Sequence, residues 1–383
     1  MESDIFTDQA WGELTQTLDA DLAFVPAPAP RALNLSDEAV ALLDDASNNL
    51  GLLAGIGRRL PNPPLLIAPY LRREAVLSSR IEGTVTSLSD LYAFDAEQPA
   101  LIEAPDVQEV QNYLLAYEYG LGRLDTLPLS LRFIRELHER LMAGVRGGGL
   151  EAGEFRTYQN WIGGATARDA VYVPPPPELM RERLDDFERF LHDRAHRPLV
   201  QAAVVHHQFE AIHPFGDGNG RVGRLLVLLF LAERGLLPQP LLYLSAYFEQ
   251  TRSTYYDLLL RVSTHGDWDA WLRYFLQGVR AQASDAADLA DRLLALHARY
   301  REELQRSRIT ANALALVDQL FINPIVSASS IQRALGVSAP TARATIRALE
   351  ERGIVREITG RSWGRVFQAD EIFGLLRSGS ADS

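Results

Sequence analysis

Twelve consecutive residues, His213 to Arg224, bring together the side-chain types that phosphate chemistry requires, in the order His-Pro-Phe-Gly-Asp-Gly-Asn-Gly-Arg-Val-Gly-Arg. Gly218, Asn219 and Gly220 tolerate positive φ, so successive backbone N–H groups can turn toward one point and form a concave anion nest. The apolar run 222–231 predicts a buried helix that begins at this nest. Because the first N–H groups of a helix lack intrahelical acceptors and the dipole is positive there, we predict a phosphate site.

The charged members of the segment fit the same chemistry. Arg221 and Arg224 are three residues apart, hence on nearly the same helix face, and two guanidinium forks suit a polyphosphate. Asp217 can hold a divalent cation, since Mg²⁺ sites beside phosphates use one or two carboxylates, water and phosphate oxygens. His213, with an unperturbed pKa of about 6.5, can take a proton from a nucleophile at neutral pH. Singly, a turn, a solvated charge and a loop histidine would explain these residues, but no packing requirement explains their concentration.

The segment meets every specified position of the Fic family signature, His-x-Phe-x-Asp/Glu-Gly-Asn-Gly-Arg-x-x-Arg, so the sequence resembles that family. The resemblance implies a protein adenylyltransferase, which moves AMP from ATP to a Tyr, Thr or Ser hydroxyl of an unidentified target protein. It implies that His213 deprotonates the target hydroxyl and that Asp217 holds Mg²⁺. It also implies that residues 218–220 cradle the α- and β-phosphates, that the two arginines take the outer phosphates, and that Phe215 anchors the loop.

A second motif lies far upstream, where Ser78-Ser-Arg-Ile-Glu82-Gly83 resembles the inhibitory motif of the family, Ser/Thr-x-x-x-Glu-Gly/Asn. The resemblance implies that Glu82 pairs with Arg224 and keeps that arginine from the γ-phosphate, because carboxylate and phosphate compete for one guanidinium fork. Two alternatives stay open. Gly83 can be an ordinary helix C-cap with Glu82 in solvent, or Glu82 can activate water to remove AMP.

Residues 154–164 and 170–177 form two short β-prone pieces around a Gly-rich, polar turn, which predicts a β-hairpin. It is similar to the flap of the Fic family, whose backbone pairs with that of the target protein. As an alternative, the hairpin only caps the domain. The predicted target contacts are Ile162, Gly163, Gly164, Tyr172, Val173 and Pro174.

Composition limits the function classes. The 383 residues, 47% hydrophobic and 23% charged, predict two or three globular domains. The chain has no cysteine, which excludes disulfides and thiolate metal sites and permits a reducing compartment. All its basic residues are arginines, which excludes a Walker phosphate loop, a Schiff base and the kinase lysine. With neither a signal peptide nor an apolar span of about 20 residues, we expect a soluble, cytoplasmic protein without membrane contact.

Helical periodicity dominates, so the predicted fold class is mainly α: a helical core with a small β-hairpin flap, plus a C-terminal winged helix. Strand signals occur only in the flap and near the C-terminus, and the Pro-Ala stretch 26–30 is predicted to lie extended on the surface. The predicted helices are 36–60, 65–82, 105–122, 129–144 (ending before Gly147–Gly149), 177–194, 198–212, 219–234, 249–264 and 267–281. The predicted domains are an N-terminal helical region 1–125 carrying the inhibitory helix, a catalytic core 126–280, a linker helix 281–307 and a winged helix-turn-helix domain 308–383.

Other polar and aromatic side chains near the signature are predicted to be structural. His206 and His207 are adjacent on a helix and point to different sides, so a core or surface role is favoured over one shared metal ion. Four tyrosines could line an adenine pocket, but at helical spacing core packing is favoured for Tyr243, Tyr247, Tyr255 and Tyr256.

The C-terminal segment 329–367 resembles a winged helix-turn-helix, with its wing turning at Gly360. The stretch 328–367 has seven arginines and three glutamates, on a chain of net charge −12. Such a basic island can place a helix in the major groove of DNA and wing arginines on phosphate. The module also mediates protein contacts and dimerisation, so DNA, a protein partner or a homodimer stay open, as does a DNA-binding regulator whose Fic core only senses nucleotide. The predicted DNA contacts are Thr341, Arg343, Arg347 and Arg361, with Thr345 near the start of the same helix.

Overall fold

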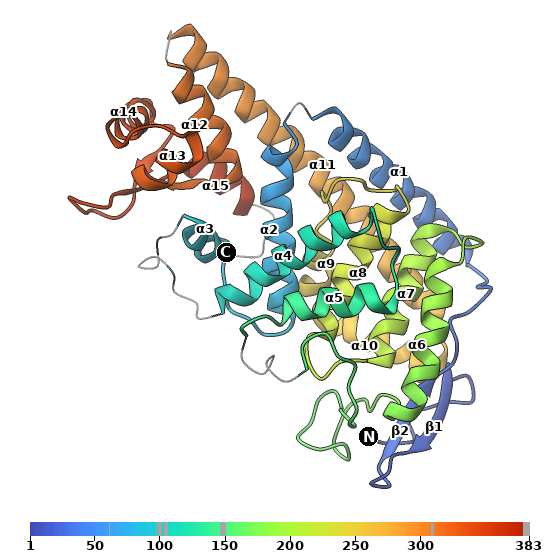
Figure 1. Ribbon diagram of the computed structural model, residues 1–383. Coiled ribbons are helices and arrows are strands. Elements are labelled where there is room, and N and C mark those ends of the chain that lie inside the picture. The colour runs from blue at the N-terminus through green and yellow to red at the C-terminus, as the bar shows by residue number, and fades with distance from the viewer. Residues whose placement is uncertain are drawn as a thin grey trace. The chain divides into compact units, whose positions relative to one another are not determined.

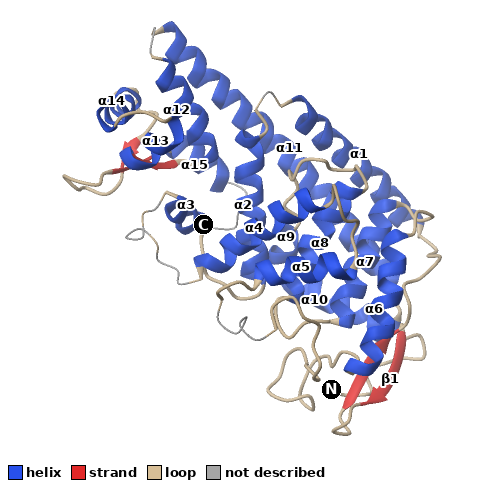
Figure 2. Ribbon diagram, in the orientation of Figure 1, coloured by secondary structure: helices blue, strands red, loops and turns tan. Residues whose placement is uncertain are grey.

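The computed structural model describes residues 1–60, 62–96, 98, 102, 106–145, 151–307 and 310–377. Helices make up most of the described chain and strands are few and short, which confirms the mainly α fold class (Figure 2). The described strands form a two-stranded and a three-stranded antiparallel sheet. The chain divides into two compact units, each assembled from three segments.

The first unit comprises residues 1–51, 111–238 and 247–281. Its centre is the pair α7 and α8, against which α5, α6 and α10 pack (Figure 1). Both central helices are buried on nearly every side, which explains their continuous apolar sequences. The helices that lie wholly or largely in this unit are α1 (Asp37–Arg59), α4 (Val107–Arg123), α5 (Leu131–Leu141), α6 (Pro177–His192), α7 (Pro198–Ile212), α8 (Asn219–Glu233), α9 (Ser245–Gln250) and α10 (Arg252–His265).

An N-terminal β-hairpin, β1 (Gly12–Gln16) and β2 (Leu22–Pro26), belongs to the same unit. The expectation of strands only in the flap and near the C-terminus is therefore wrong. In β1 the only apolar side chain is that of Leu14, so no alternation marked it, and β2 is buried only through tertiary packing. The predicted surface position of the Pro-Ala stretch is also wrong in part, because Ala29 is buried and its N–H donates to Asp186 at 3.1 Å.

The helices near the end of the first unit differ from the prediction in two ways. The predicted helix 249–264 is two helices, α9 and α10, separated at Thr251. Conversely, the predicted helices 267–281 and 281–307 are one continuous 39-residue helix, α11 (Trp268–Arg306). Its sequence contains no proline and is rich in alanine, leucine and arginine, so nothing local ends it.

The second unit comprises residues 52–110, 239–246 and 282–383. It contains α2 (Pro64–Ile81), which packs on α12, and a compact C-terminal fold. In that fold the sheet order β3-β5-β4 and the turn at Gly360, with φ +62°, confirm the predicted wing. Three helices that the sequence analysis did not name are α3 (Leu88–Asp95), α12 (Ala311–Ile322) and α15 (Asp370–Arg377). The remaining elements are β3 (Ile325–Ser327), α13 (Ala328–Leu335), α14 (Ala339–Glu350), β4 (Arg356–Glu357) and β5 (Val366–Gln368).

The residues at two predicted helix boundaries, position 105 and Gly147–Gly149, lie outside the described part of the chain. The domain boundaries at 125, 280 and 307 stay a prediction. Within the described ranges, no helix combines the length and apolar composition needed to cross a membrane.

Candidate active site

His213 follows α7 and is its left-handed C-cap, with φ 49° and ψ 61°. A non-glycine residue rarely adopts this conformation, and such residues cluster at functional sites. The imidazole Nδ1 lies 3.3 Å from the carbonyl oxygen of Glu210. Because a carbonyl only accepts, Nδ1 carries the hydrogen and Nε2 is the unprotonated nitrogen. The ring is therefore in the tautomer that can accept a proton at Nε2.

The predicted anion nest forms the start of α8. Gly218 is the N-cap in the left-handed region, with φ 76°, and the helix begins at Asn219. The backbone N–H groups of Asn219, Gly220 and Arg221 occupy the first three helical positions, where no intrahelical acceptor exists. The N–H of Gly218 donates to Oδ1 of Asp217 at 2.6 Å. This geometry suits a phosphate at the helix N-terminus.

The side chain of Asn219 closes the loop internally. Its Oδ1 accepts from the backbone N–H of Phe215 at 2.9 Å, and its Nδ2 donates to the Phe215 carbonyl at 2.8 Å. The asparagine is buried, so both hydrogen bonds are shielded from water. Sequence analysis assigned Asn219 only to the nest; the structure adds that its amide fixes the turn before the nest.

The two signature arginines, Arg221 and Arg224, are 4% and 3% exposed. Guanidinium groups this deeply buried require anionic or polar compensation. Arg221 Nη2 lies 3.9 Å from Oδ1 of Asp217 and 3.9 Å from the Met142 sulfur. The Asp217 side chain is itself 66% exposed, so its carboxylate remains open to solvent and to a cation.

Phe215 anchors the loop in the core, as the sequence analysis expected, and His138 of α5 holds it there. The two rings stack with centroids 3.7 Å apart and planes within 6°. His138 Nδ1 accepts from the Gly153 N–H at 2.9 Å, so its Nε2 carries the hydrogen that is donated to the Asp217 carbonyl oxygen, 3.1 Å away. Burial lowers the pKa of His138 to about 4, which keeps the ring neutral. Sequence analysis missed His138, because its only signal was a lone histidine on an amphipathic helix.

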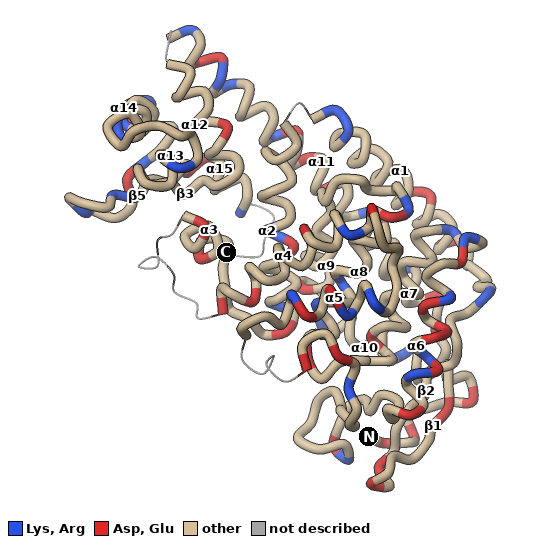
Figure 3. The backbone as a smooth tube through the Cα atoms, in the orientation of Figure 1, with Lys and Arg blue, Asp and Glu red and all other residues tan. Residues whose placement is uncertain are grey.

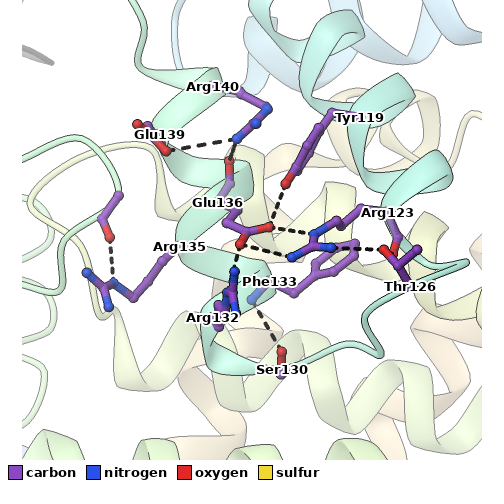
Figure 4. A network of polar contacts seen from close by, with 11 residues as sticks. Tyr119, Arg123, Thr126, Ser130, Arg132, Phe133, Arg135, Glu136, Glu139 and Arg140 are labelled. Atoms are coloured by element: carbon purple, nitrogen blue, oxygen red, sulfur yellow. Dashed lines mark hydrogen bonds and ion pairs between the residues drawn. The ribbon is translucent and has the colours of Figure 1, made fainter.

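A polar network fixes α5 to α4 and thereby positions His138 (Figure 4). Glu136 accepts from Arg123 at 2.9 Å, from Tyr119 at 2.5 Å and from Arg132 at 2.9 Å. These donors, Arg123 foremost, lower the pKa of Glu136 to about 2. The carboxylate therefore stays ionised, and the helix that contacts the signature loop is held by charge-assisted hydrogen bonds.

Arg156 connects the signature loop to the flap and was also missed. Its side chain is 1% exposed and donates to the backbone carbonyls of His213 at 3.0 Å, Tyr158 at 3.0 Å and Pro175 at 2.6 Å. Burial lowers its pKa to about 10, still well above neutral pH. The buried guanidinium of Arg156 thus holds the backbone of His213, the candidate base, against the two ends of the flap, at Tyr158 and Pro175.

The Tyr158 hydroxyl lies against Gly216, between the candidate base and the candidate metal ligand. A Cβ atom at Gly216 would come within 2.2 Å of the Tyr158 oxygen, so only glycine allows this approach. Burial and a hydrogen bond with Glu151 raise the pKa of Tyr158. The ring is 47% exposed, so it covers the loop from the solvent side.

The predicted flap hairpin is reduced to a single antiparallel bridge between Ile162 and Tyr172. Gly163 and Gly164, both at positive φ, turn the chain directly after it. On the other side, Val173 is occupied by the N-terminal segment: its carbonyl accepts from Phe24 at 2.9 Å and its N–H contacts the Met1 sulfur at 3.4 Å. The pairing within the flap therefore ends at Tyr172, because the next residue, Val173, is hydrogen-bonded to β2 instead.

This arrangement divides the predicted flap contacts into two groups. The segment 172–174 is buried, with the Tyr172 hydroxyl donating to the Ala211 carbonyl at 2.9 Å. In contrast, Trp161, Gly163 and Gly164 are exposed, while Ile162 is hydrogen-bonded to Tyr172. Trp161, which the sequence analysis did not select, is 42% exposed there.

The predicted inhibitory residues belong to the second unit. Helix α2 ends at Ile81, and Glu82 is its exposed C-cap, one residue beyond the helix rather than within it. Gly83 follows in the left-handed region with φ 95°, and Ser78 is fully buried on α2. The backbone thus confirms that a helix ends at this motif and that Gly83 follows it in the left-handed conformation. The inhibitory role of the Glu82 carboxylate stays a prediction.

The histidine pair on α7 lies in the core, in agreement with the structural interpretation. His206 Nε2 is 2.8 Å from the Tyr255 hydroxyl, and His207 Nε2 is 3.2 Å from the Leu259 carbonyl. Burial lowers both pKa values to about 3. Tyr243 and Tyr255 are buried, which confirms core packing for these two, whereas Tyr256 is 40% exposed.

Comparisons with known proteins identify the family of the chain. The N-terminal model of the Fic/DOC family matches residues 40–122, and the Fic/DOC family model matches residues 128–231, which include the whole signature. The chain belongs to the Fic family. A model described as HTH DNA binding domain matches residues 314–368 of this Fic protein.

Individual relatives give the same family. Protein adenylyltransferase Fic of Drosophila ananassae is 30% identical over 201 residues, which cover 51% of this chain and 37% of the fly protein. The Drosophila virilis protein of the same name is 31% identical, over 51% of this chain and 38% of its own length. The chain thus spans less than two fifths of these relatives. A crystal structure of a Fic family protein from Desulfovibrio desulfuricans G20 shares the fold, with TM-score 0.57, 22% identity, and coverage of 88% of this chain and 97% of that chain.

Proposed function

We propose that this protein transfers AMP from ATP to a hydroxyl side chain of a target protein and releases pyrophosphate. The observation that carries the proposal is the pairing of a left-handed His213, whose Nδ1–H faces the Glu210 carbonyl so that Nε2 is the basic nitrogen, with a helix N-terminus five residues later at Gly218. The name protein adenylyltransferase, given to relatives about 30% identical over half of this chain, supports the same reaction.

The residues of the loop account for the chemical step. The N–H groups at 219–221 cradle the α- and β-phosphates, and Arg221 and Arg224 hold the outer phosphates. His213 Nε2 takes the proton of the target hydroxyl, whose oxygen then forms a bond to the α-phosphorus. The bond from that phosphorus to the bridging oxygen breaks, and pyrophosphate leaves. His138 and Asn219 act by position, because they hold the loop rather than touch the reacting atoms.

Asp217 fits a magnesium ion as the partner of the phosphates. Its carboxylate is 66% exposed and adjoins the nest, and one carboxylate with phosphate oxygens and water is a typical Mg²⁺ environment. Among the described residues, no group of three or more His, Asp or Glu side chains could hold a metal by itself. A bound Mg²⁺ would neutralise part of the triphosphate charge.

Glu82 acts as the built-in inhibitor in this proposal by competing with the γ-phosphate for Arg224. Support comes from its place at an exposed helix end, followed by a left-handed glycine that lets the chain leave the helix at once. The same carboxylate is the candidate base for the reverse reaction, AMP removal by water.

The target protein docks on the flap as an added strand. Because Val173 is already paired with the N-terminal segment, the backbone offered to the target is that of the exposed residues Trp161, Gly163 and Gly164. Main-chain pairing gives affinity with little sequence preference, and Trp161 adds an apolar contact beside the acceptor residue.

Intact-protein and peptide mass spectrometry after incubation with Mg²⁺ and each nucleoside triphosphate tests this function. We expect Glu82→Gly to raise labelling of target or self at least about tenfold, since removing one competing charge-assisted bond is worth about 1.5–3 kcal/mol, and His213→Ala in that background to abolish it. Glu351→Gly, the same change at the exposed C-cap of α14, and His192→Ala, an exposed histidine, are matched controls that should change nothing. If Glu82→Gly protein binds ATP yet labels nothing, itself included, the proposal is wrong. Time courses with labelled target, run in both directions, separate addition from removal.

A second function, binding to DNA through the C-terminal domain, is favoured by the charge pattern of that domain. Among the described residues, Arg356 pairs with Asp370 at 2.6 Å and Arg365 with Glu350 at 3.3 Å, whereas no ion pair involves the exposed Arg343, Arg347 and Arg361. Thr341 is half-buried beside them, but Thr345 is 5% exposed and donates to the Thr341 carbonyl, which removes it from the candidate contacts. Titration of the full chain with duplex DNA at several salt concentrations tests this function.

A further inference from the structure

The wing between β4 and β5 is a preorganised loop with an exposed tip. The Glu357 carboxylate accepts from the backbone N–H groups of Thr359 at 2.8 Å and Gly360 at 2.9 Å, and these bonds, after the one from the Thr359 hydroxyl, lower its pKa. The Ile358 N–H donates to the Val366 carbonyl at 3.0 Å. The base of the wing is therefore fixed, and residues 361–365 project beyond it, all exposed.

Trp363 stands at this tip with 88% of its surface exposed. An indole is among the side chains most strongly favoured in contact surfaces, and packing on its own domain would normally cover most of it. Its neighbours Ser362 and Gly364, the latter at φ 65°, are small and leave both ring faces accessible. Fold stability therefore does not explain an aromatic side chain at this position.

The charges around the tip identify the kind of partner. Arg361 lies two residues before the indole, and Arg343 and Arg347 are exposed on α14 of the same compact fold, whose arginine-bearing helix and wing are marked in Figure 3. Glu357, the acidic residue of the wing, is turned inward as its cap. An exposed aromatic ring on a domain whose exposed arginines, Arg343, Arg347 and Arg361, form no ion pair with any described residue matches a polyanion with stackable bases better than an apolar protein surface.

We infer that the wing tip is a DNA-contacting element in which Trp363 inserts between base pairs from the minor groove while Arg361 holds the adjacent phosphate. Apolar side chains used in this way unstack one base step. The free-energy cost of unstacking is offset by the additional protein–DNA contacts that the bent duplex permits. This inference rests on the second function proposed above and adds to it a specific wedge and a predicted distortion of the duplex.

The test uses the full chain and a fluorescein-labelled duplex of mixed sequence, about 30 base pairs long, titrated over a series of salt concentrations. We expect Trp363→Ala to weaken binding about 5- to 150-fold, the range of one base–aromatic stack, with an unchanged salt slope, because an indole releases no counterions. Arg361→Gln should instead reduce the slope by about one. Leu18→Ala, which removes a side chain 93% exposed in the other unit, is the matched control and should bind as the unaltered protein does.

A duplex carrying 2-aminopurine reports the unstacking directly. Its fluorescence should rise on binding of the unaltered chain and of Trp363→Phe, but not of Trp363→Ala. Equal affinity and equal 2-aminopurine response for Trp363→Ala and the unaltered chain would overturn the wedge while leaving DNA binding intact. No binding of the unaltered chain at low salt would overturn DNA binding itself. Because Trp363 contributes little to packing, circular dichroism should show the same fold for every variant.

Discussion

Three buried neutral histidines make the stability of the first unit depend on pH in a way that the structure specifies. His138, His206 and His207 are 3%, 0% and 1% exposed, and burial lowers their pKa values to about 4, 3 and 3. In the unfolded chain each returns to about 6.5. As the pH falls, these three histidines therefore take up protons in the unfolded chain at a higher pH than in the folded chain.

The sign and size of the effect follow from linkage. Since the folded pKa values lie below the unfolded value, stability is complete above about pH 6.5 and is lost as the pH falls through 6.5 toward 4. Each histidine then costs about 2 kcal/mol between about pH 7 and pH 5, and the three together about 6 kcal/mol. This is comparable to the whole free energy of unfolding of a typical domain, about 5–15 kcal/mol.

Urea unfolding at about pH 7, 6 and 5 measures this loss. His207→Gln keeps a donor for the Leu259 carbonyl but cannot titrate, so it should reduce the pH-dependent loss by about a third, whatever its own stability. His192→Gln, at an exposed position, should leave the pH dependence unchanged. If the His207→Gln curve runs parallel to that of the unaltered protein, His207 is not a buried neutral histidine and the reasoning fails.

Two further predictions concern the signature loop. Gly218→Ala places a side chain at φ +76°, with its Cβ 3.0 Å from the Met142 sulfur. It should destabilise the fold by about 1–3 kcal/mol, measured by urea unfolding, and weaken ATP binding, measured by calorimetry. Gly235→Ala, at φ +68° with no atom within 4 Å of its Cβ, is the control for backbone strain alone. Gly216→Ala should displace the Tyr158 hydroxyl and change KM and kcat as Tyr158→Phe does, without additivity in the double variant. Fully additive effects would show that the two residues act separately.

The backbone of the signature loop is encoded locally, which is why the sequence predicted the start of α8. Gly218 and Gly220 frame the helix start, and the apolar run after them reports a buried helix through its composition. In the same way, the wing and its exposed arginines follow from short-range turn and charge patterns. Each of these signals lies within about a dozen consecutive residues.

Residues that act across the fold gave no comparable signal. His138 stacks on Phe215 from a separate helix, and Arg156 reaches three carbonyls from two segments. Each is an ordinary residue in its own neighbourhood, because the partner that defines its role is distant in sequence. Likewise, Val173 is a predicted target contact, yet its carbonyl accepts from the N–H of Phe24, which lies 149 residues earlier in the chain.

The sequence alone determined the glycine-rich helix start at Gly218, the helical character of the chain and the winged-helix pattern, since backbone conformation and amphipathic periodicity are encoded in neighbouring residues. Tertiary structure decided the tautomers of His138 and His213, the pairing of Val173 with the N-terminal segment, and, among the described residues, which arginines of the C-terminal domain form ion pairs. Those properties depend on contacts between segments far apart in the chain, and no local pattern specifies them.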